Sequence, residues 1–154
     1  MVAFIVAEIF LHNQQNTWVM AFDYGDVRIG VAIANTLLKI PHPIAVITGR
    51  NKFEKLDKIA KLVEEWTPSQ IVVGMPTASP DKELLINNIR KFSNRLTNKF
   101  KIPLTFINED FTSSMASDKL AAQSIYGKAQ RSKLDTLAAC LILQYFFETM
   151  DKKQ

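Results

Sequence analysis

Residues 18–34 read WVMAFDYGDVRIGVAIA, two apolar runs on either side of a short polar turn. Each run has the residue pattern of a buried strand, so the segment predicts a hairpin. Asp23 ends the first run, where a charged side chain is costly unless it is paired or binds a cation. We therefore consider Asp23 a candidate metal ligand. Taken alone, however, the segment favours a simpler interpretation, in which Asp23 and Asp26 are ordinary turn residues.

The size and charge of the chain set the first limits on its function. It has 154 residues, enough for one domain with its own core. Apolar residues make up 47% of the sequence and charged residues 22%, which is typical of a globular protein. The net charge of +4 permits a polyanionic partner such as nucleic acid but does not require one.

Cysteine and histidine, the common residues of zinc and redox sites, are scarce. Cys140 is the only cysteine, which excludes an intramolecular disulfide and a multi-cysteine zinc site. It lies in an apolar helical run, and we interpret it as a buried structural thiol. His12 and His42 are far apart and lack the spacing of metal ligands, so we assign neither a catalytic role.

The N-terminal segment is apolar, but Glu8 interrupts it. No basic residue precedes this run and no small-residue cleavage site follows, although a signal peptide needs both. The run is also too short to span a bilayer. We interpret residues 1–17 as an N-terminal extension that forms an extra strand or a short helix, and a misplaced start codon is equally compatible with it. We expect a cytoplasmic protein that has no membrane partner.

Residues 18–150 predict a single domain in which three strands come first, the hairpin of residues 18–35 and a strand at 44–48. The predicted elements that follow are a helix (52–66), a strand (70–74), a helix (82–100), a strand (104–107), a helix (112–120) and a final helix (133–149). Three antiparallel strands and two crossover units give a mixed five-stranded sheet with helices on both faces. This α/β order resembles that of the ribonuclease-H-like fold.

Three acidic residues stand where this architecture could bring them together. Asp23 ends the first strand, Glu109 follows the last strand, and Asp135 lies in the first turn of the final predicted helix. Mg²⁺ prefers oxygen ligands, and a pair of ions can activate a water and stabilise the leaving oxygen in phosphodiester hydrolysis. Three carboxylates held together repel one another unless cations neutralise them. The pattern therefore indicates a candidate metal site.

Each residue of this group also has a simpler interpretation. Asp135 follows Ser132 by three positions, the spacing of a capping box, and a cap and a ligand can coexist. Glu109 alone suits a solvated loop, and Thr112 could cap the next helix. Arg28 is either a surface arginine or a phosphate contact, because its planar guanidinium matches phosphate oxygens. A further basic group could form a rim on the same side, although a solvated loop explains it more simply: Lys128, Arg131 and Lys133.

Four ordered motifs resemble those of the YqgF family, also called RuvX, whose members are known as pre-16S rRNA nucleases and as Holliday-junction-resolvase-like proteins. The family pattern D-x-G-x-x-R-I-G-x-A matches residues 23–32, and its I-V-V-G-x-P strand end matches residues 71–76. Its D-E-R-L-[TS]-[TS] signature is echoed at residues 108–113, and its final D-x-[LI]-A-A-x-x-[LI]-L-Q pattern matches residues 135–144. The resemblance covers nearly the whole chain apart from the N-terminal extension.

The resemblance implies that Asp23, Glu109 and Asp135 are the catalytic and metal-binding acids, with Mg²⁺ or Mn²⁺ as the cofactor. The expected substrate contacts are Arg28, Thr112 and Ser113. Asp110 departs from the family pattern, because it replaces an arginine by a charge that would repel a phosphate or add a ligand to a nearby metal. Residues 81–82 read Asp-Lys where the family has Asp-Gly. Neither change removes an acid of the expected centre.

These observations lead to three functional hypotheses. The first is a Mg²⁺-dependent nuclease that matures the 5′ end of 16S rRNA, with Holliday junction resolution as the alternative. Its partners would be structured RNA or branched DNA and ribosomal precursor particles, and it would act as a monomer or, for junctions, as a homodimer. The second is a nucleic-acid-binding or ribosome-associated protein without turnover, which Asp110 motivates. The third is an actin-like ATPase, whose phosphate loop resembles residues 23–25, but such proteins need two domains of this kind.

Overall fold

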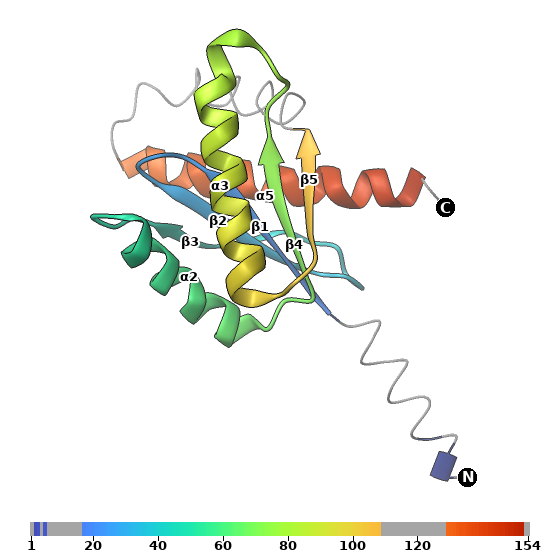
Figure 1. The fold of residues 1–154 in the computed structure, drawn as a ribbon. Helices are drawn as coiled ribbons and strands as arrows, with labels where there is room; N and C mark the ends of the chain where they lie inside the picture. Colours follow the sequence, from blue (N-terminus) through green and yellow to red (C-terminus); the bar gives the residue numbers. More distant parts are fainter. Residues whose placement is uncertain (1, 4, 6–16, 109–128, 153–154) are drawn as a thin grey trace.

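The computed structural model describes residues 2, 3, 5, 17–108 and 129–152. Its centre is a five-stranded sheet with the strand order β3-β2-β1-β4-β5. The strands are β1 (Trp18–Tyr24), β2 (Ile29–Asn35), β3 (His42–Ile47), β4 (Gln70–Met75) and β5 (Leu104–Asn108). The helices within residues 17–108 and 129–152 are α2 (Lys52–Trp66), α3 (Glu83–Phe100) and α5 (Ala129–Lys152). Helices α2 and α3 cover one face of the sheet and α5 the other, which confirms the predicted mixed sheet between two helical layers (Figure 1).

The first three strands form an antiparallel meander, as the sequence predicts. Each of the seven residues of β1 pairs with a residue of β2, and β2 pairs with β3 in turn. β3 begins at His42 rather than at residue 44, so it includes Pro43. Proline is tolerated there because β3 is an edge strand, where one row of N–H groups needs no partner.

β4 and β5 run parallel to β1, so the carboxyl ends of these three strands lie at the same edge of the sheet. The crossover helix α2 has the predicted bounds, and Asn51 caps it by accepting hydrogen bonds from the N–H groups of Phe53 and Glu54. A short 3₁₀ turn, η1 (Pro80–Lys82), precedes α3. The sequence prediction assigned residues 79–81 to a loop and began the helix at residue 82, one position before α3 begins.

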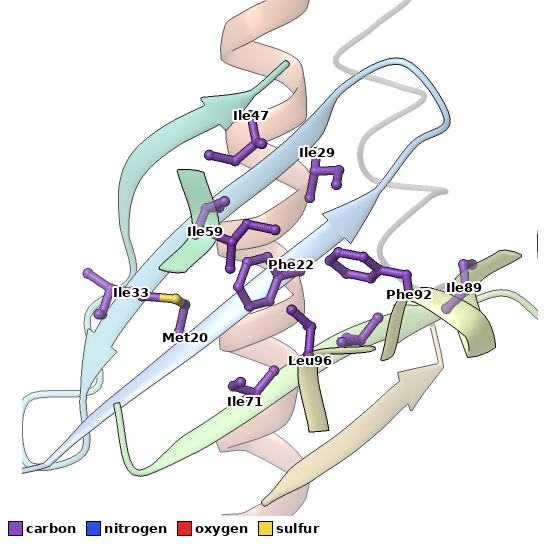
Figure 2. Close-up of a cluster of buried hydrophobic side chains, with 12 residues drawn as sticks. Met20, Phe22, Ile29, Ile33, Ile47, Ile59, Ile71, Ile89, Phe92 and Leu96 are labelled. Carbon is purple, nitrogen blue, oxygen red and sulfur yellow. The ribbon is translucent and has the colours of Figure 1, made fainter. Parts of the chain in front are cut away.

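Large side chains fill the core between the sheet and helices α2 and α3. Phe22 of β1, Ile59 of α2 and Leu96 of α3 are fully buried there (Figure 2). The ring of Phe22 meets that of Phe92 edge to face, with centroids 5.8 Å apart. This core is continuous across both crossover helices, and it anchors them to the central strands.

The core beneath α5 is built differently on its sheet side. Ala21, Ala32 and Ala34 supply small side chains there, and they form one buried cluster with Ile142 and Leu143 of α5. Small residues let a helix approach the sheet closely, because less side-chain volume separates the two backbones. The backbone of α5 therefore crosses close to the backbones of β1 and β2.

α5 is longer than its sequence pattern indicates. It begins at Ala129 and ends at Lys152, whereas the predicted helix covers 133–149. The residues by which α5 exceeds the predicted helix are largely polar, so no apolar periodicity marks them in the sequence. The predicted helix at 112–120 and its cap Thr112 lie outside the described residues. None of the helices in the described ranges is long and apolar enough to cross a membrane.

Candidate active site at the carboxyl end of β1

Asp23 lies near the carboxyl end of β1 and is half-buried. Side chains alternate between the two faces of a strand, and Val19 and Ala21 belong to the core beneath α5, so Asp23 stands on the α5 face as well. Its neighbour Tyr24 lies on the opposite face, where the centroid of its ring is 5.1 Å from the centroid of the Phe92 ring. A carboxylate therefore ends the central strand on the face that α5 covers.

Gly30 brings α5 to this strand end. It is the residue directly opposite Asp23 in the pairing of β1 with β2. A Cβ atom on Gly30 would collide with the carbonyl oxygen of Asp135 and would lie 3.2 Å from the backbone nitrogen of Thr136. Because these contacts are with backbone atoms rather than with a flexible side chain, only glycine permits the approach. The missing side chain thus places Asp135 next to the strand pair that contains Asp23.

Arg28 joins the turn between β1 and β2 to α5. Its Nε donates a hydrogen bond to Oδ2 of Asp135 across 2.7 Å, and the two side chains are 34% and 23% exposed. Charge-assisted hydrogen bonds of this length are among the stronger ones in proteins. The bond occupies Nε, so the terminal nitrogens of the guanidinium keep donors for another oxyanion. The predicted contact of Arg28 with substrate stays a prediction.

Asp135 does not lie in the first helical turn, as the sequence prediction had it. Because α5 begins at Ala129, six helical residues precede Asp135. The capping-box interpretation is therefore wrong, since Ser132 lies inside the helix rather than at its N-cap. One and two turns further along, Ala139 and Ile142 are fully buried against the sheet. Asp135 accordingly stands at the end of a helix face that continues into the core.

The remaining predicted site residues lie outside the described part of the chain: Glu109, Thr112 and Ser113. Asp110 lies there too. The chain before them ends in β5, whose last residue is Asn108. This strand end shares its sheet edge with the end of β1, because β5 and β1 both run parallel to β4. The role of Glu109 as a companion of Asp23 stays a prediction.

The described residues offer two carboxylates to a metal ion at this edge, those of Asp23 and Asp135. In the ranges 17–108 and 129–152, no group of three His, Cys, Asp or Glu side chains is placed to hold a metal. Oxygen donors suit Mg²⁺, which commonly takes one or two carboxylates from a protein. The chemistry of the described pair therefore fits such an ion. A third protein ligand is the role that the sequence assigns to Glu109.

Besides the Arg28–Asp135 pair, two features of this edge were missed by sequence reasoning. One is the contact of Gly30 with α5, for which a signal existed, because a glycine inside a strand often marks close approach of another backbone. The other is a hydrogen bond of 3.3 Å from Nδ2 of Asn108 to Oγ1 of Thr77, which ties the end of β5 to the loop after β4. No local pattern marks this second pair, since its members are 31 positions apart.

The class of protein is defined by the strand order of the sheet and by the faces on which the helices pack. The fold is similar to that of Thermus thermophilus RuvC, solved in complex with a Holliday junction substrate, with a TM-score of 0.56 and 14% identity over 88% of this chain and 96% of that one. It is also similar to a fowlpox virus resolvase, solved with Holliday junction DNA, with a TM-score of 0.50 and 13% identity over 86% and 98% of the two chains. The protein thus has the predicted ribonuclease-H-like fold, and the comparison identifies it as the RuvC type.

Residues 17–149 match the RuvX family, which is described as Holliday junction resolvase, and the chain belongs to this family. It is 38% identical over 139 residues to a protein of Neisseria meningitidis serogroup C named "Putative pre-16S rRNA nuclease", covering 90% of this chain and 92% of that protein. Proteins of the same name from Chromobacterium violaceum and Nitrosospira multiformis are 41% and 42% identical. These two matches cover 84% of this chain and 96% and 86% of the relatives.

Proposed function

We propose that this protein is a metal-dependent nuclease that hydrolyses phosphodiester bonds of pre-16S rRNA during maturation of its 5′ end. Support comes from the family and from the shared name of relatives that are 38–42% identical over most of the chain. The observation that carries the proposal is that Gly30 pairs directly with Asp23 in the sheet and contacts the backbone of Asp135 in α5. We place the activity in the cytoplasm, on free precursor RNA or on ribosomal precursor particles.

In this proposal Asp23 and Asp135 hold a divalent ion, with Glu109 as the third ligand. Mg²⁺ or Mn²⁺ suits a set of carboxylate oxygens. Such an ion, when bound, supplies an activated water and stabilises the oxygen that leaves the phosphorus. The chain itself keeps the carboxylates together. Both Asp23 and Asp135 are half-buried, and partial burial strengthens their attraction for a cation.

Arg28 has two tasks in the proposed site. Its bond to Asp135 orients one carboxylate oxygen, while its terminal nitrogens can donate to a phosphate oxygen. Without a cation at this point, the carboxylates would repel the phosphodiester. Thr112 and Ser113 add hydroxyl donors in the sequence-based assignment, and Asp110 adds a negative charge beside them.

The proposal can be tested by cleavage of a pre-16S RNA fragment that carries its 5′ leader. The rate would be measured with Mg²⁺, with Mn²⁺ and with a chelator, for the wild type and for Asp23→Asn, Asp135→Asn and Glu109→Gln. We expect each substitution to lower the rate at least about 100-fold, because each removes a ligand charge. Asp57→Asn is the matched control, since Asp57 is an exposed carboxylate on α2. Equal cleavage by the wild type and Asp23→Asn would refute the proposal.

A four-way DNA junction is the second candidate substrate, favoured by the description of the family and by the fold shared with RuvC. Resolution of a junction requires two cuts, and therefore a homodimer with two sites. The same assay with a junction, together with the molar mass in solution, separates the two substrates. Cleavage of junctions but not of RNA would replace the first candidate. Binding without cleavage of either would leave the non-catalytic role that Asp110 motivates.

A further inference from the structure

A pocket of about 260 Å³ lies on the opposite face of the sheet from the candidate nuclease site. Three parts of the chain line it, the turn after β1, the beginning of α2 and the middle of α3. Its basic residues are Arg50, Lys52, Lys55 and Arg95. None of these residues belongs to the family motifs that predicted the nuclease site, so they require a separate explanation.

Asp26 is the one acidic residue among those that line the pocket, against four basic ones. Its carboxylate accepts hydrogen bonds from the Tyr24 hydroxyl at 3.1 Å and from the Asn88 side-chain amide at 3.3 Å. Lys55 donates to the backbone oxygen of Asp26 at 2.6 Å rather than to the carboxylate. Asp26 forms no ion pair with any described residue, so the pocket keeps an excess of positive charge.

Three of the four cations are available to an anionic ligand. Arg95 forms no ion pair within the described part of the chain. Arg50 lies 3.6 Å from Glu54, but its side chain is 93% exposed, and such surface pairs are weak. Lys52 is exposed, and its Nζ lies 5.2 Å from the centre of the Phe53 ring. An incoming phosphate would therefore not have to displace a strong internal partner.

The pocket also has an apolar wall. Ile29 and Phe92 are buried there, and Tyr24 and Leu56 are half-buried, so part of a bound molecule would lie against carbon surface. Pockets for drug-sized ligands begin at about 300 Å³. The pocket volume of about 260 Å³ therefore suits a single nucleotide rather than several nucleotides of a strand.

We propose that this pocket binds a phosphate ester, with its phosphate held by Arg50, Lys52 and Arg95 and its nucleoside lying against Tyr24 and Leu56. Arginine suits the phosphate because its guanidinium can donate two hydrogen bonds to neighbouring oxygens. Base stacking on an aromatic ring tolerates any sequence, so the pocket would read the presence of a nucleotide rather than its identity.

The ligand to which we commit is a nucleotide of the nucleic acid strand that is cut at Asp23, and this part of the inference rests on the proposed function. Asp23 and Tyr24 are consecutive residues whose side chains lie on opposite faces of β1, so the pocket and the nuclease site are back to back. A strand that passes the tip of the turn, where Val27 is 70% exposed, could reach both.

Binding of a 5′-phosphorylated single-stranded RNA, measured by fluorescence anisotropy without divalent metal, tests the proposal. All proteins would carry Asp23→Asn, which prevents cleavage. The pocket variant is Arg50→Gln with Arg95→Gln, and the matched control is Lys61→Gln with Lys99→Gln, two exposed lysines on α2 and α3. We expect the pocket variant to bind about tenfold more weakly and to lower the slope of log affinity against log salt by about 1.4, for two lost contacts. The control should change affinity less than about twofold.

Amide NMR shifts identify the source of the phosphate. 5′-AMP should shift residues 24–29 and 50–56, and adenosine, which lacks the phosphate, should not. If the pocket variant binds RNA as tightly as the control but loses the 5′-AMP shifts, the pocket binds a free nucleotide. That result would overturn the proposal that the bound phosphate belongs to the nucleic acid strand. If both ligands bind the pocket variant as well as the control, the pocket itself is overturned. Failure of the nuclease proposal would leave these results unaffected, because no step of this experiment requires cleavage.

Discussion

Nε of Arg28 lies 2.7 Å from Oδ2 of Asp135, a contact that joins the turn after β1 to α5 across 107 positions of the chain. Two residues further on, Gly30 lets the backbone of Asp135 approach β2. The first contact sets the orientation of a side chain, and the second sets the height of a helix above the sheet. Substitutions at Arg28 and Gly30 should therefore affect activity and stability in different proportions.

Arg28→Gln should lower the free energy of unfolding only by roughly 0.5–1 kcal/mol, because the ion pair is partly exposed. It should lower the rate of RNA cleavage at least about tenfold, since it removes both the orientation of Asp135 and a phosphate contact. Arg28→Lys should recover stability but not the rate, because lysine lacks the planar guanidinium. Urea unfolding and cleavage rates measure the two effects, with Lys39→Gln, which breaks the exposed pair with Asp151, as the control. A full cleavage rate in Arg28→Gln would contradict this role.

Gly30→Ala should lower the free energy of unfolding by about 1–3 kcal/mol, because the added methyl group forces α5 away from β2. Activity should fall with it, since Asp135 moves with the helix. Gly49→Ala is the comparison, because its Cβ would meet first the flexible Lys55 side chain, at 3.1 Å. That variant should lose less than about 1 kcal/mol. Equal losses in the two variants, measured by urea unfolding, would show that the Gly30 contact does not limit the approach of α5.

Asn51→Ala should lower the free energy of unfolding by about 1 kcal/mol, because Asn51 caps α2. Its Oδ1 accepts hydrogen bonds from the N–H groups of Phe53 at 3.0 Å and Glu54 at 2.9 Å. Asn94→Ala replaces an exposed asparagine in α3 and should stay within about 0.5 kcal/mol of the wild type. Thermal and urea unfolding of both variants measure these changes. An unchanged free energy of unfolding in Asn51→Ala would show that the Asn51 side chain does not stabilise α2 as a cap.

Burial raises the pKa of the Cys140 thiol to about 11, so the thiol should react slowly with disulfide reagents at pH 8. Its pKa in the unfolded chain is lower, and between the two values the unfolded state therefore binds fewer protons. Stability consequently falls as the pH rises from about 9 towards 11. The unfolding free energy of Cys140→Ala should lose less over this window than that of the wild type. Identical pH profiles would mean that Cys140 titrates normally.

The strands and helices were predictable because their signals are local. The helix at 52–66 was predicted with its observed bounds, since apolar residues recur along one face and Pro68 prevents its continuation. The ends of other elements were less accurate for reasons that can be named. β3 includes a proline that only an edge position tolerates, and α5 extends into polar residues that carry no periodicity.

The candidate site divides in the same way. The sequence by itself determined the order of the elements and, through its motifs, the choice of Asp23 and Asp135 as candidate ligands. Only the tertiary structure decided that Asp135 stands within α5 rather than at its start, that Arg28 is its partner, and that Gly30 admits the helix. The start of α5 was missed because the polar residues before Asp135 carry no apolar periodicity. The other two are contacts between segments that lie about a hundred positions apart, and periodicity, which reports only on neighbours along the chain, contains no information about them.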